Sequence, residues 1–313
     1  MPEPTPSAAA ARDTADFVTL RDFLRHAVSR FNAAKLSYGH GTVEAYDEAA
    51  FLLLEGLHLP IDRLEPFLDA RLTTAERARL TALIEARVTT RKPAPYLVGR
   101  AYIQGIGFHV DERVIVPRSF IGELLGTGAI AGGEFALIPE GAPVERVLDL
   151  CTGSGCLAIL AAMAFAEAEV DAVDLSADAL AVARLNVTEH AMTRRVSLFQ
   201  GDLFAPLAGR RYDLILSNPP YVDAVAMAAL PPEFRAEPAL ALAGGDDGLD
   251  IVRRILADAP AHLNPGGGLV CEIGAGRVAL EADFADLDFH WLDTEHSRGE
   301  VFWISARALG VRG

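Results

Sequence analysis

The chain has 313 residues, 51% of them hydrophobic, and carries 43 acidic against 28 basic side chains for a formal net charge of −15. This length suffices for a domain of about 150–200 residues and a smaller one. The negative charge would repel a phosphate backbone, which disfavours a free-standing DNA or RNA binder and favours a basic protein partner. The same charge is also typical of surfaces that only need to be soluble.

The sequence also disfavours a membrane protein and a metal-binding protein. No uninterrupted apolar stretch reaches about 18 residues, and the N-terminus lacks the basic start and apolar core of a signal peptide, so we predict a cytoplasmic protein without a membrane partner. The three cysteines are an odd number without a Cys-x-x-Cys motif, and the eight histidines are scattered. They predict reduced core thiols and no metal site.

The N-terminal third predicts a tail followed by helices. Residues 1–14 are rich in Pro, Ala and Ser, which is typical of a disordered tail. Over residues 15–92 no strand pattern appears, and apolar residues recur at three- and four-residue spacing in 20–31, 49–57 and 75–88. Thr73-Thr74-x-Glu76 is typical of a helix start. Substrate recognition is the simplest role for such a helical domain, with packing against a catalytic core or dimerisation as open alternatives.

Residues 93–116 are expected to form a linker. Pro93 and Pro95 open it, and the glycines and alternating apolar residues of Tyr102–Val110 predict a β-hairpin. The remaining residues, 117–313, are expected to form an α/β catalytic domain.

A glycine turn follows the first predicted strand of this domain. Leu148-Asp149-Leu150 runs into Cys151-Thr152-Gly153-Ser154-Gly155 and then into an Ala/Leu/Ile helix, whose amino end favours a carboxylate. The next strand ends in Asp174, about twenty residues on, where nucleotide-binding folds hold ribose hydroxyls. A dinucleotide site fails on spacing, because Gly-x-Gly-x-x-Gly would need glycine where Ala158 stands.

Two more strand ends carry polar groups. Asp202 closes a third strand, and Asn218-Pro219-Pro220-Tyr221 follows the strand Tyr212–Ser217. Taken singly, Asp202 could cap a helix and the prolines could only stop a strand. Because ligands of parallel sheets lie beyond the carboxyl ends of the strands, we expect these groups to converge with the glycine turn.

The tetrapeptide suits the chemistry of a planar amide. An amide nitrogen is a poor nucleophile, since its lone pair is delocalised into the carbonyl. The side-chain oxygen of Asn218 and the backbone carbonyl of Pro219 could accept both amide hydrogens and leave the lone pair aimed at a methyl donor. Pro219 and Pro220 would hold these acceptors rigidly, while Tyr221 would offer an aromatic wall. No strong general base is required.

The pattern Asp-x-x-x-Gly-x-Gly resembles the first motif of class I S-adenosylmethionine-dependent methyltransferases. Asn-Pro-Pro-Tyr resembles the acceptor motif of those that methylate an amide or exocyclic amine nitrogen. The resemblance implies a doubly wound α/β sheet of seven strands with the last strand antiparallel, and S-adenosyl-L-methionine as the methyl donor. It also implies that Asp202 meets the adenine amine, with Leu203 against the ring. The residues that this implies at the donor are Asp149, Cys151, Thr152, Gly153, Ser154, Gly155, Asp174, Asp202, Leu203 and Asn218.

A more specific resemblance covers about residues 17–306. Pro93-x-x-Tyr96-Leu97, the hairpin, Val116-Pro117-Arg118, Glu237-Pro238 and Gly244-Gly245-Asp246-Asp247-Gly248-Leu249 join the two motifs above in this order. This combination resembles the HemK/PrmC/PrmB family of protein glutamine methyltransferases. Members acting on release factors usually read Pro-Arg-Pro-Glu-Thr-Glu after the hairpin. Here Pro117-Arg118-Ser119-Phe120 is similar to the branch that acts on ribosomal protein L-three, except that Phe120 stands where that branch usually has proline.

The resemblance implies methylation of a glutamine side-chain amide in ribosomal protein L-three. A translation release factor is the alternative substrate. An adenine-amino DNA methyltransferase shares the tetrapeptide but should carry a basic DNA-facing region, which is not evident here. A third hypothesis is a non-catalytic ribosome-assembly factor that only binds the donor or a nascent ribosomal protein.

Overall fold

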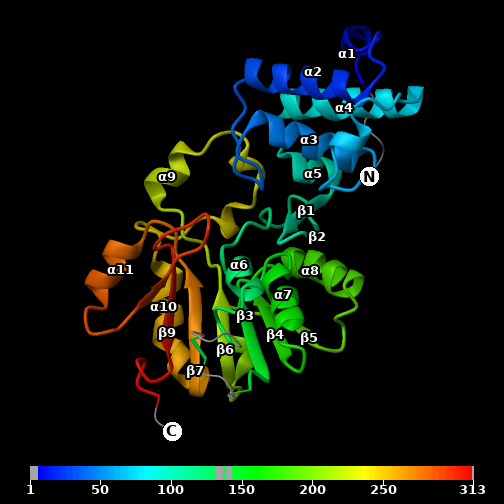
Figure 1. Ribbon diagram of the computed structural model, residues 1–313. Coiled ribbons are helices and arrows are strands. Elements are labelled where there is room, and N and C mark those ends of the chain that lie inside the picture. Colours follow the sequence, from blue (N-terminus) through cyan, green and yellow to red (C-terminus); the bar gives the residue numbers. More distant parts are fainter. Residues whose placement is uncertain (1–5, 132–136, 139–142, 312–313) are drawn as a thin grey trace. The chain divides into compact units, whose positions relative to one another are not determined.

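The computed structural model describes residues 6–131, 137–138 and 143–311. Contacts divide the chain into two units, each described here by itself. The helical unit comprises the chain up to Ala101 together with Val110–Glu112 and Leu230–Glu237. The catalytic unit comprises Tyr102–His109, Arg113–Ala229 and the chain from Pro238 onward. Figure 1 labels the elements of both.

The helical unit contains the helices that precede the hairpin and one short helix from the later segment. They are α1 (Ala8–Asp13), α2 (Leu20–Ala33), α3 (Ala45–Gly56), η1 (Glu65–Phe67), α4 (Thr74–Thr90), α5 (Ala94–Val98) and η3 (Phe234–Ala236). The hairpin strands β1 (Arg100–Ile103) and β2 (Ile106–His109) form a two-stranded sheet, which confirms the predicted hairpin. The division between the units runs through β1.

Capping explains where two of these helices begin. The Thr73 hydroxyl accepts from the backbone N–H of Glu76 while the Glu76 carboxylate accepts from that of Thr73, which confirms the predicted helix start. Thr19 and Asp22 form the same capping box at α2. The predicted disordered tail is wrong for residues 8–13, because Ala8–Asp13 form α1 with Ser7 as its cap, and residues 1–5 of that tail lie outside the described residues. A run of alanines has high helix propensity once such a cap is present.

A segment distant in sequence completes the helical unit. Leu230–Glu237 was expected within the catalytic domain, but its contacts join it to the helices. The buried carboxylate of Glu233 lies 2.7 Å from the guanidinium of Arg91 and accepts from the backbone N–H of Ser37 at 3.0 Å. Beside it, the fully buried Arg87 pairs with Glu48 at 2.7 Å. The same Arg87 guanidinium lies 3.8 Å from the Glu233 carboxylate. Removing one member of such a buried cluster typically costs about 3–5 kcal/mol, so this segment is firmly held.

The catalytic unit is built on parallel strands joined by helices. Its strands are β3 (Arg146–Leu150), β4 (Glu169–Asp174), β5 (Val196–Gln200), β6 (Tyr212–Ser217), β7 (Leu263–Glu272), β8 (His290–Leu292) and β9 (Val301–Ser305). Its helices are α6 (Ile121–Gly126), α7 (Cys156–Ala164), α8 (Ala177–Glu189), η2 (Ala205–Leu207), α9 (Ala224–Ala229), η4 (Ala239–Ala241), α10 (Asp250–His262) and α11 (Arg277–Asp283).

Within the described residues the larger sheet has seven strands in the order β5-β4-β3-β6-β7-β9-β8. Strands β3 to β7 are parallel, and β9 runs antiparallel to both β7 and β8. This confirms the predicted doubly wound sheet with an antiparallel last strand. The strand order reverses between β3 and β6, and such a switch point is where open α/β sheets bind ligands.

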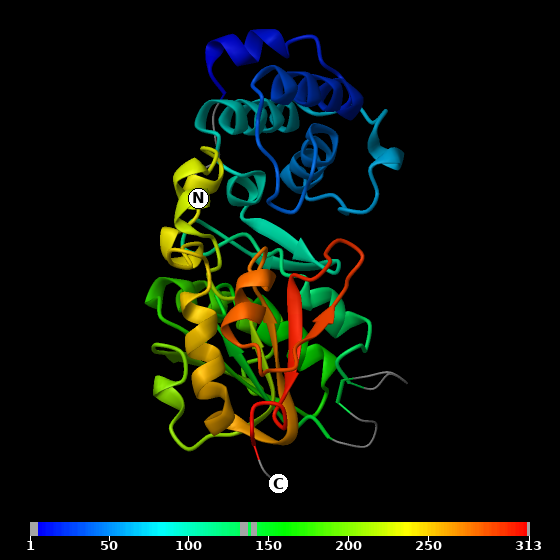
Figure 2. The same ribbon diagram turned by 90° about the vertical axis from the view of Figure 1, so that its left-hand side faces the viewer.

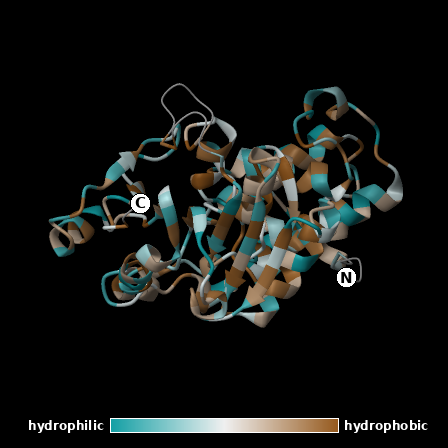
Figure 3. Cartoon of the chain, turned by 90° about the horizontal axis from the view of Figure 1, so that it is seen from below, coloured by the Kyte–Doolittle hydropathy of each residue, from teal (hydrophilic) through white to brown (hydrophobic). Residues whose placement is uncertain are grey.

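Two hydrophobic clusters cover the two faces of the sheet. One draws on α6, α7 and α8, and the other on η2, α10 and α11. Figure 2 shows α10 running along one side of the sheet, and in Figure 3 hydrophobic residues, coloured brown, lie along the strands and the neighbouring helices. Strands buried on both faces explain the nearly continuous apolar runs in the sequence.

Asn186 fastens the hairpin to the glycine turn. This fully buried residue of α8 accepts from the backbone N–H of His109 at 2.7 Å and donates to the carbonyls of His109 and Ser154 at 3.0 and 2.8 Å. Its donors and acceptor are all used, as burial of an amide requires. No helix in the described part of the chain has both the length and the apolar character that crossing a membrane requires.

Candidate active site

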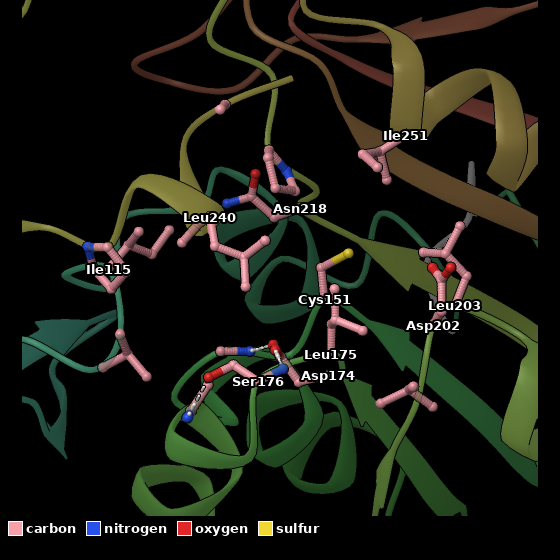
Figure 4. A pocket seen from close by; sticks show the side chains of 18 of the residues that line it. Ile115, Cys151, Asp174, Leu175, Ser176, Asp202, Leu203, Asn218, Leu240 and Ile251 are labelled. Carbon is pink, nitrogen blue, oxygen red and sulfur yellow. Dashed lines mark hydrogen bonds between the residues drawn. The ribbon is translucent and has the colours of Figure 1, made fainter. Parts of the chain in front are cut away.

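A pocket lies at the switch point of the sheet. Its lining draws on the ends of β3, β4, β5 and β6, the start of α8 and the segment that follows the hairpin. We call it the donor pocket; it is lined by Arg113, Val114, Ile115, Cys151, Gly153, Val173, Asp174, Leu175, Ser176, Ala179, Gly201, Asp202, Leu203, Asn218, Pro220, Pro238, Leu240, Ala241, Ala243 and Ile251. Figure 4 shows side chains of this lining from close by, with ten of them labelled.

Asp174 stands at the end of β4 and ties the glycine turn to α8. One carboxylate oxygen accepts from the backbone N–H of Gly153 and the other from that of Ser176, both at 2.8 Å, as the dashed lines of Figure 4 show. Burial raises the pKa of Asp174, and these hydrogen bonds oppose the rise. Each oxygen retains a lone pair for a ligand hydroxyl.

Gly153 leaves the pocket open where another residue would fill it. Its φ of +55° favours glycine, and a Cβ built there would meet nothing within 4 Å. Two non-glycine residues of the lining, Cys151 and Leu203, have φ values of +59° and +50°. Such conformations are uncommon outside glycine and cost of order 1 kcal/mol or more each, and they cluster at functional sites.

Asp202 also lines the donor pocket, and its side chain is about half exposed. One of its carboxylate oxygens accepts from Arg254 at 2.7 Å, with side-chain exposures of 51% and 48% for the two residues. An ion pair this exposed typically contributes about 0–1 kcal/mol, so it holds Asp202 only weakly. The second oxygen offers lone pairs that can accept from a ligand amine.

The remaining residues of the predicted turn have a different position. Asp149, Thr152, Ser154 and Gly155 do not line the donor pocket among the described residues. Asp149 is fully buried, and one of its oxygens accepts from the hydroxyl of Thr152 at 2.5 Å and from the backbone N–H of Ala158 at 3.0 Å. Its other oxygen has no hydrogen-bond partner among the residues that the structure describes. Asp149 therefore holds the turn against the start of α7.

Burial dominates the electrostatics of the turn. It raises the pKa of Asp149 to about 7, although both donors lower it. It also raises the pKa of the Cys156 thiol to about 12, so this cysteine is an inert core group. Cys271 is likewise buried, whereas Cys151 is half-buried and faces the donor pocket.

A smaller pocket adjoins the donor pocket. Its lining is Ile115, Arg118, Asn218, Pro219, Tyr221, Val222, Ala241 and Leu242. We call it the acceptor pocket. Asn218, Ile115 and Ala241 line both pockets, so the tetrapeptide lies where the two meet.

The acceptor pocket is bounded by a closed loop of chain. The backbone N–H of Val222 donates to the carbonyl of Leu242 at 2.8 Å, and that of Gly244 donates to the carbonyl of Val222 at 2.9 Å. A Cβ at Gly248 would lie 2.3 Å from the carbonyl oxygen of Tyr221, so only glycine fits there. This close approach explains the Gly-rich segment after Glu237-Pro238.

Comparison with known proteins gives the family. Residues 136–234 match the model of the methyltransferase small domain. The ribosomal protein uL3 glutamine methyltransferase of Bradyrhizobium diazoefficiens is 61% identical over 295 residues, covering 94% of this chain and 92% of that protein. The chain belongs to the family of the ribosomal protein uL3 glutamine methyltransferases. Proteins of the same name from Bordetella pertussis and Neisseria gonorrhoeae are 55% and 50% identical, covering 94% of this chain and 97% and 96% of theirs. This family member is an S-adenosylmethionine-dependent methyltransferase.

The donor pocket has the chemistry that this donor needs. Ribose hydroxyls and the adenine amine require acceptors, which Asp174 and Asp202 supply at separate places in the lining. Val173, Leu203 and Ile251 offer apolar surface for the purine. The two carboxylates also suit the positive charge of the sulfonium.

Several lining residues escaped prediction from the sequence. Arg113 and Ile115 lie between the hairpin and the catalytic strands, and Pro238–Ala243 follow the excursion of the chain into the helical unit. Pro238–Ala243 reach the site only because the chain comes back to pair with Val222. No local pattern in the sequence reports that return, although the Glu237-Pro238 motif could have drawn attention to it.

Proposed function

We propose that this enzyme transfers the methyl group of S-adenosyl-L-methionine to the side-chain amide nitrogen of a glutamine in ribosomal protein uL3. The position of Asn218 in both pockets carries the proposal, together with family membership. A group bound by Asn218 in the acceptor pocket would face a methyl group held in the donor pocket. The relatives named above carry this activity in their names.

Each pocket residue has a proposed task. Asp174 would accept from the ribose hydroxyls and Asp202 from the adenine amine, with Leu203 against the ring. Gly153 and Cys151 would line the path of the donor. Asp149, Thr152, Ser154 and Gly155 would support it indirectly, because they set the shape of the turn.

In the acceptor pocket, the Asn218 side-chain oxygen and the Pro219 carbonyl would accept the two amide hydrogens of the glutamine. This arrangement would localise the nitrogen lone pair and aim it at the methyl group. Positioning at roughly 3 Å for in-line displacement would supply much of the acceleration. The amide nitrogen becomes acidic as it is alkylated, so water can take its proton and no general base is needed.

The charge of the chain supports a basic ribosomal protein as substrate. With 43 acidic and 28 basic side chains, the enzyme would attract such a partner at long range. We further propose that the helical unit recognises the substrate, and that the enzyme acts in the cytoplasm, where ribosomal proteins are made.

Methyl transfer to purified proteins tests the proposal. The enzyme would be incubated with labelled S-adenosyl-L-methionine and, in separate reactions, with uL3 and a release factor. Label on a glutamine of uL3 supports the proposal. Efficient labelling of the release factor with uL3 untouched would overturn the substrate and leave the amide chemistry standing.

A further inference from the structure

A buried carboxylate lies beside the acceptor tetrapeptide. Glu272 is the last residue of β7 and is only 1% exposed. Strands β6 and β7 pair in register with Ser217 opposite Cys271, so the next residues along are Asn218 and Glu272. Nothing in the sequence marks Glu272 as part of the site, since it lies more than fifty residues beyond the tetrapeptide.

Glu272 joins two segments that line the acceptor pocket. One oxygen accepts from the Tyr221 hydroxyl at 3.0 Å. The other accepts from the Ser119 hydroxyl at 2.7 Å and from the backbone N–H of Phe120 at 3.0 Å. Tyr221 lines the pocket, and so does Arg118, the residue before Ser119. A single side chain therefore ties these two segments of the lining together.

The hydrogen-bond directions require an acceptor at the Phe120 end, where a backbone N–H can only donate, and the carboxylate also accepts at the Tyr221 end. The backbone N–H of Ile121 donates to the Ser119 oxygen at 3.2 Å, which leaves the Ser119 proton for Glu272. Both oxygens of an ionised carboxylate accept, whereas a glutamine would present an amino group to one of its two partners. An amide would be cheaper to bury, but it could not accept from both segments.

The ring of Tyr221 is also fixed from its face. A Cβ at Gly274 would lie 2.9 Å from the ring carbons Cδ2 and Cε2, so this glycine, two residues after Glu272, packs directly against the ring. The end of β7 thus controls both the hydroxyl and one face of Tyr221. Residues whose rotamers are locked in this way hold a site within the tolerance that catalysis needs.

We propose that Glu272 is the positioning residue of the acceptor pocket, setting the spacing between Tyr221 and the Arg118–Ser119 segment at which the glutamine amide is held. This role rests on the proposed function, because it concerns the same amide site. Its carboxylate must be ionised to accept from both sides. Burial raises the pKa of Glu272 to about 6, with the nearby charge of Glu300 adding to the rise and the three hydrogen bonds opposing it. The same charges act on the pKa of Tyr221, which Arg118 lowers and Glu300 raises.

The central test is Glu272→Gln. We expect kcat/KM for the protein substrate to fall by roughly 10- to 100-fold, as small misplacements of a reacting group do. The dissociation constant of the donor should stay within about twofold, because Glu272 does not line the donor pocket. Glu272→Asp keeps the charge but is one methylene shorter, so it should lose rate similarly. Tyr221→Phe combined with Glu272→Gln should lose less than the product of the single effects.

The pH profile separates positioning from simple support of the fold. At saturating donor, kcat/KM of the wild type should fall as pH drops through about 6, because protonated Glu272 loses an acceptor. The Gln variant should lack this acid limb. Glu300→Gln is the matched control: at pH 8 its rate should equal that of the wild type, with the limb moved to lower pH.

A readout without substrate keeps this inference distinct from the proposed function. In protein labelled with ¹³Cζ-tyrosine, the resonance that Tyr221→Phe removes should titrate near pH 6 in the wild type and not in Glu272→Gln. A Gln variant with wild-type kcat/KM, an unchanged acid limb and an unchanged tyrosine titration would overturn the inference. An inactive wild type with the expected titration would instead count against the proposed function alone.

Discussion

The donor turn and the acceptor loop each depend on a buried carboxylate, and the two differ in how completely they are satisfied. Asp149 lies in β3 and Glu272 at the end of β7, on either side of the strand that leads to Asn218. Asp149 accepts two hydrogen bonds at one oxygen and none at the other, whereas Glu272 accepts three over both oxygens.

The pKa values of Asp149 and Glu272 follow the number of hydrogen bonds that each carboxylate accepts. Burial raises both, to about 7 for Asp149 and about 6 for Glu272. Each added donor stabilises the charged form, so the better satisfied group ionises more readily. The acceptor loop is therefore held by a carboxylate that is largely ionised at neutral pH. The donor turn is held by one that stands near its own titration.

Asn218 is where the two regions meet, and Asn218→Ala should have the largest effect. We expect kcat to fall about 10²- to 10³-fold, the loss typical of one well-placed contact to a reacting group. Donor affinity should be nearly intact, since the proposed contacts to the donor are made mainly by Asp174 and Gly153. Methyl-transfer kinetics and calorimetry measure the two effects. Asp286→Ala, at an exposed position of the catalytic unit, is the control. Near-normal turnover would exclude the proposed amide contact.

Asp149→Asn should change how the stability of the protein depends on pH, because it removes the ionisable group that holds the donor turn. The folded pKa of Asp149 lies above its ordinary value of 3.8, so the folded state binds the proton more tightly. Stability is therefore lost as pH rises through this interval, by about 2–3 kcal/mol between pH 5 and pH 8 from this group. Urea unfolding without donor should show the variant gaining that amount relative to the wild type over the same range.

The exposed Asp286→Asn should show no such relative gain. The Asn side chain can still accept from Thr152 and Ala158 at one oxygen, which keeps the turn. An equal pH dependence in Asp149→Asn and the wild type would show that Asp149 is not the group that titrates.

Part of this arrangement could be predicted from the sequence because it is local. The capping box at Thr73, the glycine turn and the tetrapeptide depend on neighbouring residues and on strand ends, and the predicted fold is confirmed. Glu272 could not be predicted, because its partners Tyr221 and Ser119 come to it only when distant strands pair. The direction of the Asp149 side chain depends on tertiary packing in the same way. So does the attachment of Leu230–Glu237 to the helical unit.

Asp174→Asn should weaken binding of the methyl donor and have little effect on the acceptor pocket. We expect the dissociation constant of S-adenosyl-L-methionine to rise by about tenfold, or about 1.4 kcal/mol, because the amide replaces one of the two oxygens proposed to accept from ribose and also sets an amino group against the backbone N–H of Gly153 or Ser176. Turnover at saturating donor should change by no more than a few fold. Calorimetry checks the first number, with the exposed Asp178→Asn as control. Unchanged donor affinity would place the ribose elsewhere.

Salt should produce the smallest effect, and on the acceptor side only. Because attraction between exposed charges weakens with ionic strength, KM for uL3 should rise about threefold to tenfold between about 0.1 M and 0.5 M salt. kcat should change less, and donor affinity least. Steady-state kinetics at several salt concentrations check this. An equal rise in KM for an uncharged glutamine peptide would remove long-range attraction as the cause.

In the proposed function, Asn218 presents a glutamine amide to a methyl group across two adjoining pockets. Mass spectrometry of uL3 after reaction with labelled S-adenosyl-L-methionine tests it most directly. We expect one labelled methyl group on the side-chain nitrogen of a glutamine, formed by the wild type and nearly absent with Asn218→Ala. A methyl group on a lysine or a backbone nitrogen, or equal labelling by both proteins, would contradict it.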